Sequence, residues 1–133
     1  MLLKVGAIQQ TAETLIGEFG IEPPVPGMKS GLLSGGNQQK VIVARELSRR
    51  PELLIASQPT RGLDIGAARL IRELLIRQAE EGRAGFLISA DLSEIMALSD
   101  RIGVMYRGRV VDVVERAEAT EEALGLMMAG VVG

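Results

Sequence analysis

The chain has 133 residues with a net charge of −2, a length and balance that fit one compact domain. It has no cysteine and no histidine, which excludes disulfides, thiolate metal sites and the commonest general base. Lysine and arginine are scattered among the acids, so nucleic acid is not expected as a partner. No apolar run reaches transmembrane length, and Gln9, Gln10 and Glu13 interrupt the region where a signal peptide needs its apolar stretch. These features predict a cytoplasmic protein.

The first third of the chain is predicted to hold two helices separated by a proline-rich segment. Apolar residues recur at helical spacing over about residues 5–19. Residues 22–27 contain three prolines and predict a stiff extended linker. A second helix is predicted to begin after Ser34 and to end near residues 49–51, Arg-Arg-Pro.

The start of this second helix is predicted to be an anion site. Ser34 suits the N-cap position, and the free N–H groups and dipole of the following turn favour a negative ligand. Gly35 and Gly36 in the first turn each cost helix stability by about 1 kcal/mol relative to alanine. Close approach of a ligand such as phosphate explains that cost. The alternative is an ordinary capped helix that follows a loop.

The rest of the chain alternates strands and helices, which indicates an α/β fold. The last helix is expected to be capped by Thr120. In chain order we expect a buried strand over 53–56, a helix over 66–81, a buried strand over 86–89, a helix over 93–99, a hairpin of strands 102–106 and 110–114, and a helix over 120–128. The inner side of the 66–81 helix is predicted to carry Ala67, Leu70, Leu74, Leu75 and Ile76.

Two motifs in this order give the chain a family resemblance. Residues 33–36 read L-S-G-G, and residues 57–64 read S-Q-P-T-R-G-L-D. The chain resembles the nucleotide-binding domain of ABC transporters, whose signature is L-S-G-G and whose Walker B segment ends in D-E-P-T-x-G-L-D. More narrowly, it is similar to the second ATPase half of tandem importers for simple sugars and nucleosides. The resemblance extends from Thr11 to Gly130.

The resemblance implies a P-loop NTPase-type parallel sheet with helices that is incomplete, because no G-x-x-x-x-G-K-[ST] sequence occurs. Residues 1–50 would be the end of the helical subdomain with the signature helix, and residues 51–133 the C-terminal part of the ATPase core. The P-loop strand would lie upstream, so the chain is expected to be a fragment, an excised piece or the product of a split reading frame.

The resemblance also implies that the chain's own ATP site is degenerate, with no catalytic group intact and no metal site. The Walker B acid aligns with Ser57, the catalytic glutamate with Gln58 and the switch histidine with Ala90. A hydroxyl cannot hold hydrated Mg²⁺ as a carboxylate does, and an amide is no base near neutral pH. Asp91 is expected to cap the next helix. The chain alone is therefore expected to have no ABC-type ATPase activity.

The intact signature is expected to act in trans. Ser34, Gly35, Gly36 and Asn37 would bind nucleotide whose P-loop lies on a partner ATPase half-domain, with ATP and Mg at this composite site and none held tightly by the chain alone. The loop residues Gly62, Leu63 and Asp64 would reach across the same interface. Permease subunits in the membrane would be further partners, which places the chain at the cytoplasmic face during sugar or nucleoside import.

Two further expectations concern alternatives to this function and the missing strand. The chain could instead be a non-transport interaction module, a remnant cassette without turnover. In the family, strands 86–89 and 102–106 flank the P-loop strand, so a slot lined by Leu87, Ile88 and Val104 would remain. The hairpin would move to close this slot, or another molecule would supply a strand, and the isolated chain is expected to self-associate as a dimer.

Overall fold

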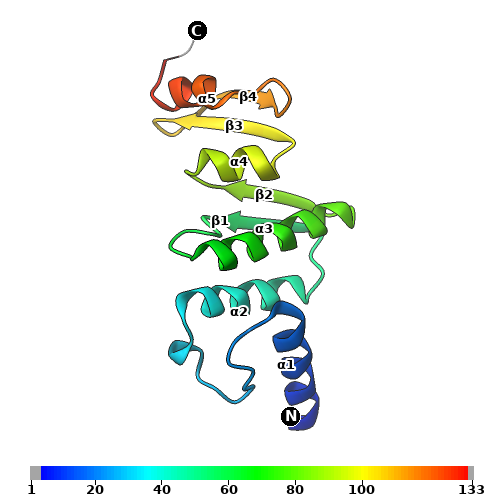
Figure 1. Cartoon of the computed structure of the whole chain (residues 1–133). Helices are drawn as coiled ribbons and strands as arrows, with labels where there is room; N and C mark the ends of the chain where they lie inside the picture. Colours follow the sequence, from blue (N-terminus) through cyan, green and yellow to red (C-terminus); the bar gives the residue numbers. More distant parts are fainter. Residues whose placement is uncertain (1–3, 132–133) are drawn as a thin grey trace. The chain divides into compact units, whose positions relative to one another are not determined.

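The computed structural model describes residues 4–131, and these form two compact units. The first unit is the chain up to Leu54 together with Pro59–Gly85, and the second is Ile55–Gln58 together with the chain from Phe86. The elements are labelled in Figure 1. The first unit contains α1 (Val5–Phe19), the 3-10 helix η1 (Ser30–Leu32), α2 (Gly35–Leu47) and α3 (Ile65–Glu80).

The core of the first unit forms where α1, α2 and α3 pack together. On α3, Ala67, Ile71 and Leu74 are buried because spacings of four and three residues place them on one stripe of the helix. Ile71 is fully buried, although the sequence reading omitted it, and Ile76 is 41% exposed, so its predicted inner position is wrong. Ile76 follows Leu74 by two residues, which turns its side chain toward the opposite side of the helix. The buried cluster consists of Phe19, Ile21, Ala44, Leu47, Ile71 and Leu74.

The segment between α1 and η1 is folded by turns, so the predicted stiff extended linker is wrong. Gly20 ends α1 in the left-handed region with φ 57°. The Val25 N–H donates to the Pro23 carbonyl at 2.8 Å, and the Met28 N–H donates to the Val25 carbonyl at 3.0 Å. Proline fixes φ but leaves ψ open, so a proline-rich segment can turn as readily as it can extend.

Strands β1 (Leu53–Ser57) and β2 (Ala84–Ile88) form a two-stranded sheet. The Ala84 N–H donates to the Glu52 carbonyl at 2.9 Å, and the Gln58 N–H donates to the Ile88 carbonyl at 2.7 Å. The beginnings of the two strands therefore lie side by side, as do their ends, and the strands are parallel. Both strands were predicted to be buried, which is wrong: Ile55 is 64% exposed and Phe86 58%. Parallel strands are buried when further layers cover both faces, and in the described residues each strand pairs along one edge alone.

The second unit combines the ends of β1 and β2 with α4 (Leu92–Leu98), β3 (Arg101–Tyr106), β4 (Arg109–Glu115) and α5 (Glu121–Met128). The predicted hairpin is confirmed, because β3 and β4 pair antiparallel with Tyr106 opposite Arg109. Its two turn residues, Arg107 with φ 48° and Gly108 with φ 78°, both lie in the left-handed region that tight hairpins require.

Helix α5 packs on the hairpin and closes the second core. The side-chain oxygen of Thr120 accepts the Ala123 N–H at 3.1 Å, which confirms the predicted N-cap. The core consists of Ile102, Val104, Ala119 and Leu124. Beyond α5, Gly130 lies so close to the Tyr106 ring that a Cβ there would meet two ring carbons at 2.5 Å. The Arg107 guanidinium also lies over the Tyr106 ring, 5.2 Å from the ring centroid.

The hairpin does not close onto β2 in the structure described. Strand β3 is paired with β4 alone, and β2 is paired with β1 alone. The hairpin therefore does not pair with residues 86–88 of β2 to replace the missing strand. The α/β class and the predicted helices and strands are confirmed.

The burial of Ile71 makes it a test of the first core. Ile71→Ala is expected to lower the free energy of unfolding by about 2–5 kcal/mol, because it leaves a cavity among packed neighbours. Urea unfolding followed by circular dichroism measures this. Ile76→Ala is the matched control on the same helix and is expected to cost less than about 1 kcal/mol. Equal losses in the two variants would contradict the assigned orientation of α3.

Candidate functional site

The N-terminus of α2 is built as the sequence predicts, with Ser34 as its N-cap. Ser34 has an extended backbone, φ −60° and ψ 157°, and its Oγ accepts the Asn37 N–H at 3.3 Å. The Asn37 side-chain Nδ2 donates to the same oxygen at 3.0 Å. The Gln38 N–H donates to the Ser34 carbonyl at 2.8 Å, which begins the helical ladder. The cap therefore uses the donors of the third and fourth helical positions.

Two backbone donors at this helix end have no acceptor within the helix. They are the N–H groups of Gly35 and Gly36, which occupy the first two helical positions. Ser34 and Gly35 are exposed, and Gly36 is half-buried. No acidic residue lies in this first turn. The end of α2 thus offers two N–H groups and a hydroxyl at the positive end of a helix dipole, which suits a phosphate group.

Asp64 lies within the same unit beside residues 34–37, which are called the signature turn below. Its Oδ1 accepts the Ala67 N–H at 2.9 Å and so caps α3. A Cβ placed on Gly36 would be 3.1 Å from the Ala67 Cβ and 3.5 Å from the Asp64 Oδ2. The structure therefore brings together Gly36 and Asp64, two predicted site residues that are distant in sequence. Glycine at position 36 allows the two helix starts to approach this closely.

The other residues of the predicted interface loop shape the approach to Asp64. Gly62 has φ 74°, in the region that favours glycine, and the Leu63 N–H donates to the Thr60 carbonyl at 3.2 Å. The Leu63 side chain packs against the core of the first unit. Their contact with a partner across an interface stays a prediction.

Asn37 is engaged on both ends of its side-chain amide. While Nδ2 donates to Ser34, Oδ1 accepts the Glu22 backbone N–H at 2.9 Å. One turn further along α2, the Lys40 Nζ donates to the Gly20 carbonyl at 2.8 Å. Sequence reasoning did not find Glu22 or Lys40, because contacts across 15 and 20 residues leave no local pattern. The role of Asn37 in nucleotide binding stays a prediction.

The residues predicted to mark a degenerate site gather at the carboxyl edge of the β1–β2 sheet, in the second unit. Ser57 ends β1, and Ala90 follows β2 closely. Between them, Gln58 has φ 48° and its N–H is bound by the Ile88 carbonyl at 2.7 Å. These three side chains offer a hydroxyl, an amide and a methyl group. None of them carries the negative charge that Mg²⁺ binding or general-base chemistry requires.

Asp91 acts as the predicted cap of the next helix. Its Oδ1 accepts the Ser93 N–H at 2.9 Å and the Glu94 N–H at 3.2 Å. These two backbone donors belong to the first turn of α4, where a capping side chain accepts. The structure thus supports the capping role of Asp91.

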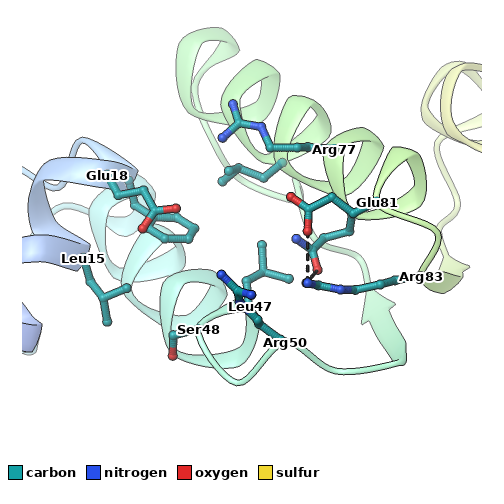
Figure 2. A pocket seen from close by; sticks show the side chains of 11 residues that line it. Leu15, Glu18, Leu47, Ser48, Arg50, Arg77, Glu81 and Arg83 are labelled. Carbon is teal, nitrogen blue, oxygen red and sulfur yellow. Dashed lines mark hydrogen bonds and ion pairs between the residues drawn. The ribbon is translucent and has the colours of Figure 1, made fainter.

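The first unit contains a cavity of about 290 Å³, whose lining side chains are drawn in Figure 2. Two of its charged groups form an ion pair, Arg83 with Glu81 at 3.0 Å. Arg83 also donates to the Gln78 amide oxygen at 2.6 Å. It is lined by Leu15, Glu18, Phe19, Leu47, Ser48, Arg50, Leu74, Arg77, Gln78, Glu81 and Arg83. None of the predicted site residues lines this cavity.

In its fold the chain is similar to ATP-binding cassettes. The cassette MJ0796, in a dimeric post-hydrolysis state bound to ADP and Pi, matches with a TM-score of 0.74 and 26% identity. The match covers 87% of this chain and 50% of the cassette. No protein-family profile matches the chain. Its fold is therefore that of part of an ABC ATPase cassette, incomplete because half of the matched cassette has no counterpart here.

The sequence relatives narrow this class to importers. The chain is 48% identical over 129 residues to the guanosine import ATP-binding protein NupO of Bacillus subtilis. It is 50% identical over 101 residues to the ribose import ATP-binding protein RbsA 2 of Rubrobacter xylanophilus. These matches cover 97% and 76% of this chain but only 25% and 20% of the relatives. The chain is homologous, over most of its length, to the ATP-binding proteins of ABC importers. None of the helices in residues 4–131 combines the length and apolar character needed to cross a membrane.

The close contact at Gly36 predicts different effects for alanine at the two signature glycines. Gly35→Ala is expected to raise the free energy of unfolding by up to about 1 kcal/mol, because its Cβ meets nothing within 4 Å and alanine favours the helix. Gly36→Ala is not expected to raise the free energy of unfolding, because its Cβ would be only 3.1 Å from the Ala67 Cβ, which cannot rotate away. Chemical denaturation of both variants measures the difference.

The control removes the opposing methyl. The double variant Gly36→Ala with Ala67→Gly is expected to have a higher free energy of unfolding than the two single changes would give when added. The reason is that the double variant has no clash at this contact. Additive effects of the two substitutions would show that the helix starts do not touch at this point.

Proposed function

We propose that this chain is part of the ATP-binding subunit of an ABC importer and supplies its signature turn to an ATP site completed by a partner ATPase half. The observation that carries this proposal is the exposed end of α2. There the Gly35 and Gly36 N–H groups have no acceptor in the helix, and Ser34 adds a hydroxyl. Preorganised donors of this kind stabilise charge on a transferring phosphoryl group. The relatives import guanosine or ribose by name, which supports uptake of a nucleoside or simple sugar.

The proposed division of labour is asymmetric. The partner half provides the P-loop, the Walker B acids and the bound Mg²⁺, whereas this chain provides donors to the γ-phosphate. The edge formed by Ser57, Gln58 and Ala90 is inactive in this proposal, because it has no carboxylate to hold the metal or to polarise water. Turnover therefore requires both halves, and MgATP binds the chain alone only weakly.

Permease subunits in the membrane are the second class of proposed partner, which places the chain at the cytoplasmic face. The relatives are import proteins by name, and an ATPase that drives import must act on a translocation pathway.

Asp64 belongs to the proposed interface between the two ATPase halves, because it lies beside Gly36 of the signature turn.

Variants of the signature turn test whether it acts in trans. In the complete ATP-binding protein assembled with its permease, Ser34→Arg and Gly35→Asp are each expected to lower ATP turnover about 100-fold or more. The arginine blocks the turn, and the aspartate places a carboxylate against the phosphate. Because a Cβ at position 35 has open space, the Gly35→Asp effect acts on the ligand and leaves the fold intact.

The control for this experiment lies in the edge that is proposed to be inactive. Gln58→Ala is expected to change turnover by less than about threefold, since position 58 performs no chemistry in the proposal. Turnover is measured as phosphate release at saturating ATP. If Gln58→Ala were as damaging as the signature variants, the asymmetric assignment would be wrong.

The isolated chain is expected to self-associate through a second copy. In the described residues β1 and β2 form a sheet of two strands, and such sheets are rarely stable alone. Ile55, Phe86 and Ile88 expose between 45% and 64% of their surface on these strands. An exposed apolar strand with an unpaired edge is a template for pairing with another molecule.

Light scattering tests this at tens of micromolar protein. A dimer is expected for the unmodified chain, and Phe86→Lys is expected to shift it toward monomer, because charges on edge strands oppose pairing. The control is Ile76→Lys on α3, at an exposed side chain outside the sheet, and it is expected to leave the dimer unchanged. A stable monomer that unfolds cooperatively would contradict self-association.

A further inference from the structure

The hydroxyl of Ser34 has only one direction left for its proton. Its oxygen accepts two hydrogen bonds, from the Asn37 backbone N–H at 3.3 Å and from the Asn37 Nδ2 at 3.0 Å. A hydroxyl has two acceptor lone pairs and one donor proton, so both lone pairs are directed at Asn37. The proton therefore points away from Asn37, and the hydroxyl can engage an additional group only as a donor.

The orientation of the Asn37 amide is fixed from its other end. Its Oδ1 accepts the Glu22 backbone N–H at 2.9 Å, and a backbone N–H can only donate. If the amide oxygen and nitrogen were exchanged, the Asn37 Nδ2 would face the Glu22 backbone N–H, and both groups are donors. The Glu22 contact thus directs Nδ2 toward Ser34.

We infer that Asn37 is a positioning residue that holds the Ser34 hydroxyl as a donor toward a bound phosphate. This inference rests on the proposed function of the signature turn, and it assigns Asn37 a role that works through Ser34. An uncommitted serine hydroxyl rotates and can accept as well as donate, whereas the one in this chain is set to donate only. A phosphate oxygen, which is an acceptor, then binds without a competing orientation of the hydroxyl.

Aspartate at position 37 is the sharpest test, because it keeps the shape and reverses one polarity. One carboxylate oxygen would still accept the Glu22 N–H. The other would replace the Nδ2 donor with an acceptor, so the Ser34 proton would turn inward to donate to it. The proposed donor to the phosphate would be lost without removal of the serine.

The experiment is a double-mutant cycle on ATP turnover in the complete ATP-binding protein assembled with its permease. Ser34→Ala and Asn37→Asp are each expected to reduce turnover about tenfold to a hundredfold, the range for a lost hydrogen bond to a charged group. The new negative charge at position 37 also acts on the phosphate directly. That direct effect is measured separately by Asn37→Asp in the Ser34→Ala background.

Asn37→Asp is expected to be at least about fivefold more damaging with Ser34 present than with alanine there, which is the mark of coupling between contacting residues. Lys40→Met is the matched structural control. It removes a second hydrogen bond from α2 to the segment after α1, at Gly20, and is expected to change turnover by less than about threefold.

The outcomes separate the inference from the proposed function. If Ser34→Ala is damaging but Asn37→Asp has the same effect in both backgrounds, the positioning role is overturned and the signature still acts. If Asn37→Asp is neutral beside an intact serine, the positioning role is again overturned. If Ser34→Ala itself has no effect, the positioning role is overturned as well. The proposed function fails only if Gly35→Asp is also without effect on turnover.

Discussion

The close approach of the starts of α2 and α3 is the contact on which the first unit depends. At Gly36 the absence of a side chain allows the Ala67 methyl and the Asp64 carboxylate to lie against the first turn of α2. Larger side chains on the same two helices, such as Leu47 and Ile71, form the buried core. The absence of a side chain at Gly36 and the larger side chains in the core together specify how the helices are packed. The same contact brings the signature turn and Asp64 together, so stability and site geometry arise from one interface.

The two units differ in the chemistry that they retain. The first offers backbone donors at the end of α2, with the N–H groups of Gly35 and Gly36 and the hydroxyl of Ser34 directed outward. The second offers an edge with Ser57, Gln58 and Ala90, where the backbone is tightly held but the side chains lack charge. Donors of hydrogen bonds recognise an anion without transforming it, whereas hydrolysis also needs a metal and an activated water. This contrast is the physical basis for proposing that the chain assists a site that a partner completes.

Features encoded within a few residues were predictable from the sequence, and those that depend on distant residues were not. Ser34, Asp91 and Thr120 cap helices by accepting N–H groups two or three residues ahead, so their roles follow from local chemistry. The hairpin follows in the same way from Arg107-Gly108 between apolar runs. The exposure of β1 and β2 depends on what covers a sheet, and the Asn37–Glu22 bond joins residues 15 apart. Neither leaves a periodic pattern in the chain.

The packing of Tyr106 gives the molecule an internal optical probe. The chain has one tyrosine and no tryptophan, and this tyrosine contacts Gly130 and the Arg107 guanidinium in the second unit. Its ultraviolet emission therefore reports on the hairpin and the segment after α5, and it does not report on α1, α2 and α3. Far-ultraviolet circular dichroism is dominated by helices, most of which belong to the first unit. Melting curves from the two signals would coincide if the units unfold together and would separate if each unfolds alone, without any label being added.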